Sequence, residues 1–334
     1  MLKSISILSA LAVLTAFISF DAETPIKADV QIQEWQVPWE DTRPRDPYVA
    51  PDGDVWFVGQ RGDYISEFSP ETDEFRRLDL PEGAGPHNCI VDEDGYIWYA
   101  GNRAAHIGRV DPETGEITKY PMPNERARDP HTLVFDNNGD IWFTVQGGNF
   151  VGKLTVATGD VQLIDVPTQR ARPYGIKVDR NNRPWIALFG THKLATVDPE
   201  TMELKEIPLE REDARPRRLD ITSDGTIWYV DYAQGYLGKY DPQEESFEEW
   251  KLPEGSGSRP YAMVADAGDN LWMVETGVSP NLFVGFNPES EEFFSSTPIE
   301  SGGGTVRHMV FHEPTNSIWF GTDTNYLGQA RLNK

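Results

Sequence analysis

The sequence predicts an all-β fold, a seven-bladed β-propeller, and three observations support this prediction. First, a pattern of the form D-x-x-G-x-(apolar)-W-aromatic, or a close variant, recurs seven times along the chain. Second, short apolar runs alternate with turn residues, and the 334 residues include 29 Gly and 25 Pro. Third, no stretch has the pattern of a long amphipathic helix. A period in the low forties with strand-like runs is typical of propeller blades.

One tryptophan marks each repeat, and the intervals between these tryptophans are 42, 44, 43, 43, 44 and 47 residues. Clear copies of the pattern read DEDGYIWY, DNNGDIWF and TSDGTIWY. Length alone would suggest two domains, but a propeller is one closed unit, so the repeat takes precedence. The marker residues are Trp56, Trp98, Trp142, Trp185, Trp228, Trp272 and Trp319.

Each repeat divides into four strand-like runs. In the second repeat these are HNCIVD, YIWYAG, HIGRVDP and ITKYPMP, and tight turns such as DEDG and PETG connect them. The chain ends on YLGQARLNK, which matches a third run, so the last repeat has no fourth run of its own. The early segment IQEWQVPWE resembles the fourth runs of other repeats. We therefore expect residues 32–38 to form the outer strand of the last blade and to close the ring.

The N-terminus predicts export. Lys3 precedes an uncharged apolar run, which is the layout of a signal peptide. We assign residues 1–22 to this signal and residues 23–334 to one propeller domain, a monomer in the periplasm or outside the cell. Cys89 is the only cysteine, so the chain has no internal disulfide. The net charge of −24 argues against nucleic acids and anionic membranes as partners.

The tryptophan period also locates a set of polar residues at one mouth of the central channel. The residue eleven positions before each tryptophan opens the innermost strand of its blade. For the first blade we assign Tyr48 instead, on the expectation of a shorter turn there. The predicted ring is Tyr48, His87, His131, Tyr174, Arg217, Tyr261 and His308. Arginines stand just upstream, and the set predicts an anionic or carbonyl-rich ligand. They are Arg45, Arg128, Arg172, Arg215, Arg259 and Arg307.

A second polar layer is expected three or four residues after each tryptophan, where the second strand returns to the same mouth. Its carboxylates and amides are groups that hold a divalent ion or orient a base. These residues are Gln60, Asn102, Gln146, Asp231, Glu275 and Asp323.

The repeat region, roughly residues 32–334, resembles the streptogramin B lyase (virginiamycin B lyase) family. The matching motifs are RPYGI at 172–176, RPYAM at 259–263, HIGRV at 106–110 and YPMPN at 120–124. This resemblance implies a seven-bladed propeller that opens a cyclic depsipeptide by elimination, with Mg²⁺ as cofactor. In the family pattern, each of the last two blades begins with a histidine, and a Glu follows the last tryptophan by four. Here His308 matches, Tyr261 replaces the other histidine, and Asp323 replaces the Glu.

The residues and the resemblance together predict a carbon–oxygen lyase that acts by β-elimination. Elimination needs a base beside a carbonyl and a group that stabilises the enolate charge. We assign His308 as the base and Tyr261 as a second acid or base, with His87 and His131 as another candidate centre. The expected metal ligands are Asp323 and Glu275, and the expected substrate-binding residues are Arg259, Arg307, Tyr48, Tyr174 and Arg217. The expected substrate is a small molecule or oligosaccharide that is anionic or contains an ester.

Two alternatives remain open. One is a propeller without catalytic activity that binds a glycan or peptide at the same mouth. The other is a metal-dependent lactonase or other hydrolase, which needs a tight cluster of carboxylates and amides around the metal.

Overall fold

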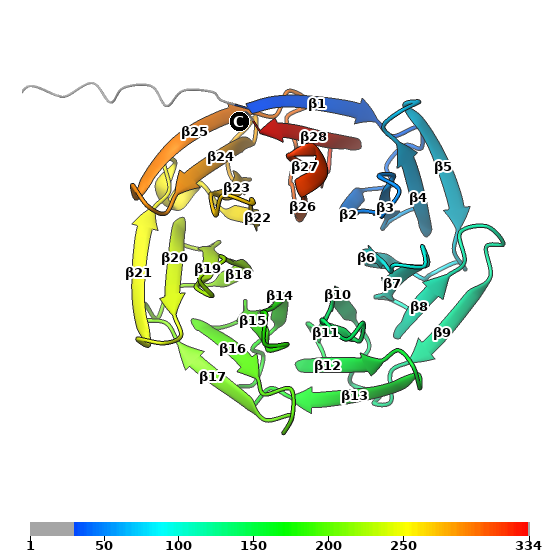
Figure 1. Ribbon diagram of the computed structural model, residues 1–334, viewed down its shortest axis with the longest axis horizontal. Coiled ribbons are helices and arrows are strands. Elements are labelled where there is room, and N and C mark those ends of the chain that lie inside the picture. The colour runs from blue at the N-terminus through cyan, green and yellow to red at the C-terminus, as the bar shows by residue number, and fades with distance from the viewer. Residues whose placement is uncertain (1–29, 333–334) are drawn as a thin grey trace, which may run out of the picture.

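The computed structural model describes residues 30–332, which form 28 strands in seven four-stranded antiparallel sheets. The sheets stand around a central axis like the blades of a propeller, as Figure 1 shows. The predicted seven-bladed all-β fold is therefore confirmed. The predicted signal segment, residues 1–22, lies outside the described residues. Among the described residues, no helix is long and apolar enough to cross a membrane.

Each blade contributes one strand to each of four concentric layers (Figure 1). The innermost strands are β2 (Pro44–Val49), β6 (Pro86–Val91), β10 (Pro130–Phe135), β14 (Pro173–Val178), β18 (Pro216–Ile221), β22 (Pro260–Ala265) and β26 (Met309–His312). The second strands are β3 (Val55–Gly59), β7 (Ile97–Gly101), β11 (Ile141–Val145), β15 (Pro184–Leu188), β19 (Ile227–Asp231), β23 (Leu271–Glu275) and β27 (Ser317–Gly321).

The third strands are β4 (Tyr64–Ser69), β8 (His106–Val110), β12 (Phe150–Thr155), β16 (Lys193–Val197), β20 (Tyr236–Asp241), β24 (Leu282–Asn287) and β28 (Tyr326–Leu332). The outer strands are β5 (Glu74–Asp79), β9 (Ile117–Pro121), β13 (Asp160–Asp165), β17 (Leu204–Pro208), β21 (Ser246–Lys251), β25 (Glu292–Pro298) and β1 (Val30–Gln36). Two short 3₁₀ turns complete the described elements, η1 (Gly255–Gly257) and η2 (Glu313–Thr315).

The outer strand of blade 7 comes from the start of the described chain. Strand β1 pairs antiparallel with β28 over seven residues, from Val30 opposite Leu332 to Gln36 opposite Tyr326. The ring of Trp35 stacks on Trp319, with their centroids 5.5 Å apart. The early and late parts of the chain are thus joined by a strand pair with an aromatic contact beside it (Figure 1).

The acidic residue of the repeat pattern holds the turn and the tryptophan together. In blade 2, Asp92 Oδ1 accepts hydrogen bonds from two backbone amides of the turn. Its Oδ2 accepts one from the Trp98 indole nitrogen at 2.8 Å. Asp179 and Asp266 bind their own tryptophans in the same way, at 3.1 and 2.8 Å. The pattern therefore encodes a hydrogen-bonded corner that recurs in blades 2, 4 and 6, and in blade 5 the Thr222 hydroxyl binds the Trp228 indole instead.

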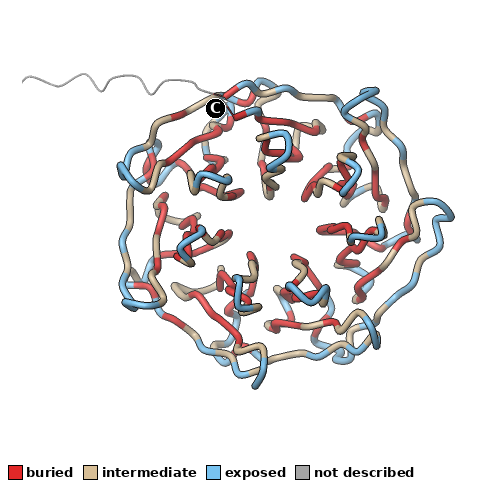
Figure 2. The backbone as a smooth tube through the Cα atoms, viewed as in Figure 1, coloured by how far each residue is buried: buried red, intermediate tan, exposed pale blue. Residues whose placement is uncertain are grey.

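The apolar core lies between adjacent blades and leaves the outer strands half in solvent. One cluster joins Trp56 of blade 1 to Cys89 and Tyr99 of blade 2, and similar clusters follow around the ring. Figure 2 shows the inner three layers mostly buried and the outer strands alternating between exposed and half-buried residues. This packing fixes the innermost strands, whose starts carry the polar residues of the site.

Candidate functional site: a polar ring at the channel mouth

A β-bulge near the start of the inner strands determines which side chains face the central axis. In blade 2, Pro86 lies opposite Gly101 and Cys89 opposite Tyr99, so β6 has one residue more than its partner strand. The inner strands of blades 1 to 6 all have such a shift near their first residues. A bulge turns side chains away from regular alternation. It can therefore present two successive residues, such as His87 and Asn88, near the axis.

In blade 1, the ring position is occupied by Arg45 and not by the predicted Tyr48. Pro44 lies opposite Gly59, and Tyr48 lies opposite Trp56 as Ile90 lies opposite Trp98 in blade 2. The assignment of Tyr48 to the ring was therefore wrong, because the turn of blade 1 is as long as those of blades 2 to 6. Arg45 takes the ring position and is 3% exposed. The half-buried Tyr48 packs instead against the apolar clusters on both faces of blade 2.

Ring residues from blades 2, 3, 4 and 6 form one continuous arc. The ring centroids of His87 and His131 are 3.6 Å apart, and those of His131 and Tyr174 are 4.1 Å apart. The hydroxyl of Tyr174 hydrogen-bonds to that of Tyr261. The arc ends at Arg307, which faces the Tyr261 ring at 5.6 Å. The sequence predicted two separate candidate centres, one with His87 and His131 and the other with Tyr261 and His308. In the structure, Tyr174 joins the first pair to Tyr261.

Arg217 of blade 5 lies among aromatic rings beside this arc. Its guanidinium carbon is 3.5 Å from the centroid of Tyr261 and 4.9 Å from that of Tyr174. The half-buried Phe189 and Tyr232 complete the enclosure at 4.5 and 4.3 Å. These two aromatic residues follow their blade tryptophans by four positions, where the predicted layer held only amides and carboxylates.

A charged pair below the ring was also missed. Arg218 donates to Asp46 of blade 1 at 3.2 Å and to the Thr132 hydroxyl of blade 3 at 3.0 Å. Its Nε also reaches the backbone oxygen of Arg307 in blade 7, at 3.1 Å. Arg218 therefore reaches from blade 5 to three other blades. The sequence does contain a signal for this pair, because Asp46 and Arg218 are charged residues within predicted inner strands.

The three histidines of the ring are held neutral. Burial lowers the pKa of His87 and His131 well below the usual value, and nearby arginines lower it further. For His308, burial followed by Arg218 lowers the pKa to about 3. Neutral imidazoles hydrogen-bond a substrate at neutral pH, but such a low pKa makes His308 a weak base.

The two ring tyrosines have pKa values shifted in opposite directions. Burial alone would raise the pKa of Tyr174, but Arg217, Arg45 and Arg218 together outweigh it, so the pKa falls below the usual value of about 10. Burial, followed by the neighbouring Tyr174, raises the pKa of Tyr261. Tyr174 therefore loses its proton first, while Tyr261 keeps its own.

Four buried atoms of the ring have no hydrogen-bond partner within the described part of the chain. They belong to residues from blades 1, 2, 5 and 7. The first three occupy the ring position of their blades. In blade 7, Met309 lies opposite Phe320 as Cys89 lies opposite Tyr99, so Arg307 takes the ring position and His308 is the next residue along the strand. Unpaired buried polar groups are rare in proteins and often mark functional sites. The atoms are Arg45 Nη2, His87 Nδ1, Arg217 Nε and His308 Nδ1.

The two expected metal ligands do not fit a shared divalent cation. Glu275, three residues after its tryptophan, is fully buried at the end of β23, where its carboxylate accepts the Glu254 amide at 3.1 Å. Asp323, four residues after its own, binds Arg307 and lies 3.5 Å from Arg43. A carboxylate already held by two cations disfavours a third one. Within residues 30–332, no three His, Cys, Asp or Glu residues form a group suited to a metal.

Five further predicted residues lie in three different settings. Three amides, Gln60, Asn102 and Gln146, are half-buried just past the second strands, at the same strand ends as the ring. Asp231 is fully buried and binds Arg211 at 2.6 Å, so it belongs to the interior of blade 5 rather than to the mouth. The side chain of Arg259 is exposed, and its backbone oxygen accepts the Thr276 hydroxyl at 2.8 Å.

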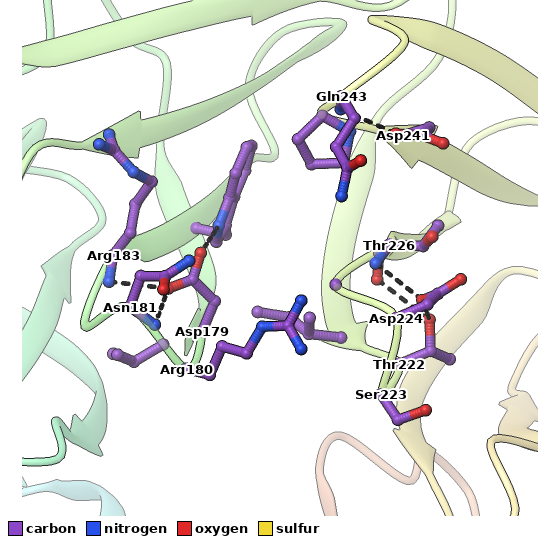
Figure 3. A pocket seen from close by; sticks show the side chains of 15 residues that line it. Asp179, Arg180, Asn181, Arg183, Thr222, Ser223, Asp224, Thr226, Asp241 and Gln243 are labelled. Carbon is purple, nitrogen blue, oxygen red and sulfur yellow. Dashed lines mark hydrogen bonds between the residues drawn. The ribbon is translucent and has the colours of Figure 1, made fainter.

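A separate cleft of about 580 Å³ lies between blades 4 and 5, and Figure 3 shows its lining. It is built from the turns at the far ends of β14 and β18, so it opens on the face opposite the ring. Its carboxylates are already in use, because Asp179 accepts two turn amides and the Trp185 indole. Asp224 accepts the Thr222 hydroxyl and the Thr226 amide (Figure 3). This cleft therefore follows from the repeated corners of the fold.

Comparison with known proteins places this geometry in a family context. The model of the virginiamycin B lyase family matches residues 18–197. The crystal structure of virginiamycin B lyase from Staphylococcus aureus is 24% identical and has a TM-score of 0.82, with 91% of this chain and 100% of that chain covered. A catalytically inactive histidine-to-alanine variant of that lyase, with quinupristin, gives the same values.

A second kind of protein shares the fold at lower similarity. Hydrazine synthase from Kuenenia stuttgartiensis is 11% identical, with a TM-score of 0.72 over 87% of this chain and 96% of that chain. At such identities the structural likeness speaks for the fold alone. No functionally curated protein matches the sequence.

Proposed function

Since this chain belongs to the virginiamycin B lyase family, we propose that it is an exported carbon–oxygen lyase that works by β-elimination at the channel mouth. The basic start and apolar run of the N-terminus support export. The arc of tyrosines, histidines and arginines supports the reaction, because it combines proton-transfer groups with fixed positive charge.

The tyrosine pair is the observation that carries this proposal. In many enzymes, two titratable groups with pKa values pushed apart serve as base and acid. The pKa of Tyr174 is lowered by three arginines that outweigh its burial, whereas the pKa of Tyr261 is raised by burial. We therefore assign Tyr174 as the base, in place of His308, and Tyr261 as the acid.

The proposed step needs only the groups of the ring. Ionised Tyr174 takes the proton from the carbon next to a substrate carbonyl. The electron pair released forms a carbon–carbon double bond, while the carbon–oxygen bond at the neighbouring carbon breaks. Tyr261 gives its proton to the leaving oxygen, and the proton on Tyr174 then passes to Tyr261 through the hydrogen bond between the two hydroxyls, so both groups are restored and no water is consumed. Arg217 and Arg307 stabilise the negative charge that develops on the carbonyl oxygen.

No metal ion takes part in this step, although the family resemblance implies Mg²⁺. Asp323 is bound by two arginines, and Glu275 lies inside its blade. We therefore expect a chelator to leave the rate of elimination within about twofold of its value with added Mg²⁺. A larger, Mg²⁺-reversible loss would contradict the assignment of the arginines as the only electrophiles.

The experiment uses the full chain and a panel of a streptogramin B antibiotic, uronate oligosaccharides and simple hydroxy-acid esters. Elimination is followed by the ultraviolet absorbance of the new conjugated double bond. We expect Tyr174→Phe to lower kcat by about 10²- to 10⁴-fold, which is the usual contribution of a general base. The matched control is Tyr96→Phe, because Tyr96 lies far from the ring, against Arg109.

The same assay separates the alternatives. Hydrolysis adds water and leaves no conjugated double bond, so such a product would favour a lactonase or other hydrolase. Binding of a panel member without any product would favour a propeller that only binds its ligand. If Tyr174→Phe retained full elimination activity, the base would have to be another residue.

A further inference from the structure

Positive charge exceeds negative charge around the ring. Arg45 and Arg218 share the single carboxylate of Asp46, and Arg43 and Arg307 share that of Asp323. Among the described residues, Arg217 makes no ion pair, and its only hydrogen-bond acceptor is the Tyr174 hydroxyl at 3.4 Å. A largely buried guanidinium without a carboxylate is costly, because desolvation is not offset by an opposite charge. In an otherwise acidic chain, this excess singles out the mouth as a place for an anion.

Two nitrogen atoms in this region are buried and lack an acceptor. Arg45 donates from Nε to Asp46 at 2.9 Å and from Nη1 to Gln60 at 3.2 Å, but Nη2 has no partner. Arg217 is in the same situation at Nε. Arg45 is 3% exposed, so its Nη2 lies away from the molecular surface. Arg45 lies on the inner strand of blade 1 and Arg217 on that of blade 5, and both guanidinium groups lower the pKa of the Tyr174 hydroxyl.

The surroundings of Arg217 also restrict what can carry the anion. Phe189 and Tyr232 are half-buried, stand with their ring centroids 5.8 Å apart, and each lie within 4.5 Å of the Arg217 guanidinium carbon. Their faces suit the carbon skeleton of a ring next to a charged group. The three half-buried amides Gln60, Asn102 and Gln146 come from blades 1 to 3 and add polar groups to the same mouth, and Gln60 already accepts a hydrogen bond from Arg45.

We propose that the substrate carries a carboxylate, which Arg217 and Nη2 of Arg45 bind while Phe189 and Tyr232 contact the adjoining ring. This inference deepens the proposed elimination and rests on it for the identity of the ligand as a substrate. A carboxylate next to the reacting carbon would also bring the acidic proton close to Tyr174. A neutral ester leaves Arg217 without an opposite charge and Arg45 Nη2 without a charged acceptor, and is the disfavoured class.

Binding is tested by calorimetry with two carboxylates from different chemical sources, digalacturonate and N-acetylphenylalanine, each beside its own methyl ester. We expect at least one acid to bind at least about tenfold more tightly than its ester, because charge-assisted bonds exceed neutral ones by 1.4 kcal/mol or more. The acid that binds more tightly shows whether the carboxylate belongs to a uronate or to an amino-acid derivative. Arg217→Gln is expected to remove this preference, whereas Arg217→Lys keeps part of it and guards against misfolding.

The matched control is Arg180→Gln, since Arg180 is exposed on the opposite face (Figure 3). A second readout is the absorbance of ionised tyrosine, because a bound carboxylate offsets the arginines and moves tyrosine ionisation to higher pH. Equal binding of acid and ester, or an unchanged preference in Arg217→Gln, would overturn the inference. Selective binding of an acid without any elimination product would refute the proposed lyase activity but not the carboxylate site. Elimination of neutral esters by Arg217→Gln would refute the carboxylate site but not the lyase activity.

Discussion

Glu275 is a carboxyl group that is buried without an ion pair. It is fully buried, one of its oxygens has no partner among the described residues, and the other accepts the amide of Glu254. Burial, helped by the nearby Glu254 charge, raises its pKa to about 7. The unfolded chain has the ordinary value of about 4.3. Between these values the folded protein binds the extra proton, so stability falls as pH rises from about 4.3 to 7 and stays low above that range.

Glu275→Gln removes this pH-dependent penalty. We expect the variant to be more stable than the parent by about 1–3 kcal/mol at pH 8 and by little at pH 5, measured by urea unfolding. Glu289→Gln is the control, because Glu289 is exposed and should change stability equally little at both pH values. A gain of the same size at pH 5 would show that packing rather than ionisation is responsible.

At the scale of the strand, regular features were predictable and irregular ones were not. The Trp98 corner is local, because Asp92 binds its own turn and its own tryptophan, so its pattern is readable in the sequence. Arg45 was also within reach of the sequence, because it stands eleven residues before Trp56, and only the expectation of a shorter turn in blade 1 put Tyr48 in its place. The predicted second polar layer included residues that follow the tryptophans by three positions as well as by four. Neighbouring residues on a strand face opposite sides, so Glu275 was wrongly placed at the mouth.

Strand β1 contacts blades 7 and 1 through the side chain of Trp35. Trp35 stacks on Trp319, packs against Phe68 at 4.9 Å, and donates its indole hydrogen to Asp73 at 2.8 Å. Phe68 and Asp73 belong to blade 1, so this one side chain joins blades 7 and 1.

Trp35→Ala should therefore weaken the junction of the two ends of the ring. We expect a loss of about 2–4 kcal/mol in the free energy of unfolding, near the lower part of the range for a large aromatic because Trp35 is only half-buried. Gln33→Ala, an exposed position on the same strand, should cost less than about 0.5 kcal/mol. Equal losses in the two variants would mean that the strand pairing, and not the aromatic contact, holds the junction.

At the scale of the whole molecule, the blades are connected in two different ways. Apolar clusters join each blade to its neighbour, whereas Arg218 crosses the axis to Asp46, Thr132 and the Arg307 backbone. The Thr132 hydroxyl in turn lies 2.8 Å from His131 Nδ1. The crossing therefore fixes distances between blades that are not adjacent, and it supports the ring of the site from below.

This crossing predicts a specific dependence on pH. Burial would raise the pKa of Asp46, but Arg45 and Arg218 outweigh it, with His308 adding to their effect, so the pKa is lowered. A lowered carboxyl pKa contributes stability that is present above the unfolded value of about 3.9 and is lost as pH falls below it. The buried neutral histidines also destabilise the fold in acid, as pH falls below about 6.5, and the Asp46 charge offsets part of this because it raises the pKa of His131 and His308 against their burial.

A double-mutant cycle with Asp46→Asn and Arg218→Met isolates the pair. We expect each single variant to lose about 3–5 kcal/mol at pH 7, because it leaves a buried charge without its partner, and the double variant to lose clearly less than the sum. Urea unfolding at pH 7, 5 and 3.5 should show the parent losing more stability below pH 4 than Asp46→Asn does. Asp94→Asn, in an exposed turn, controls for removing any one carboxylate. Additive losses at pH 7 would mean that Arg218 supports the ring through Thr132 and the Arg307 backbone, and that the charge of Asp46 serves Arg45 alone.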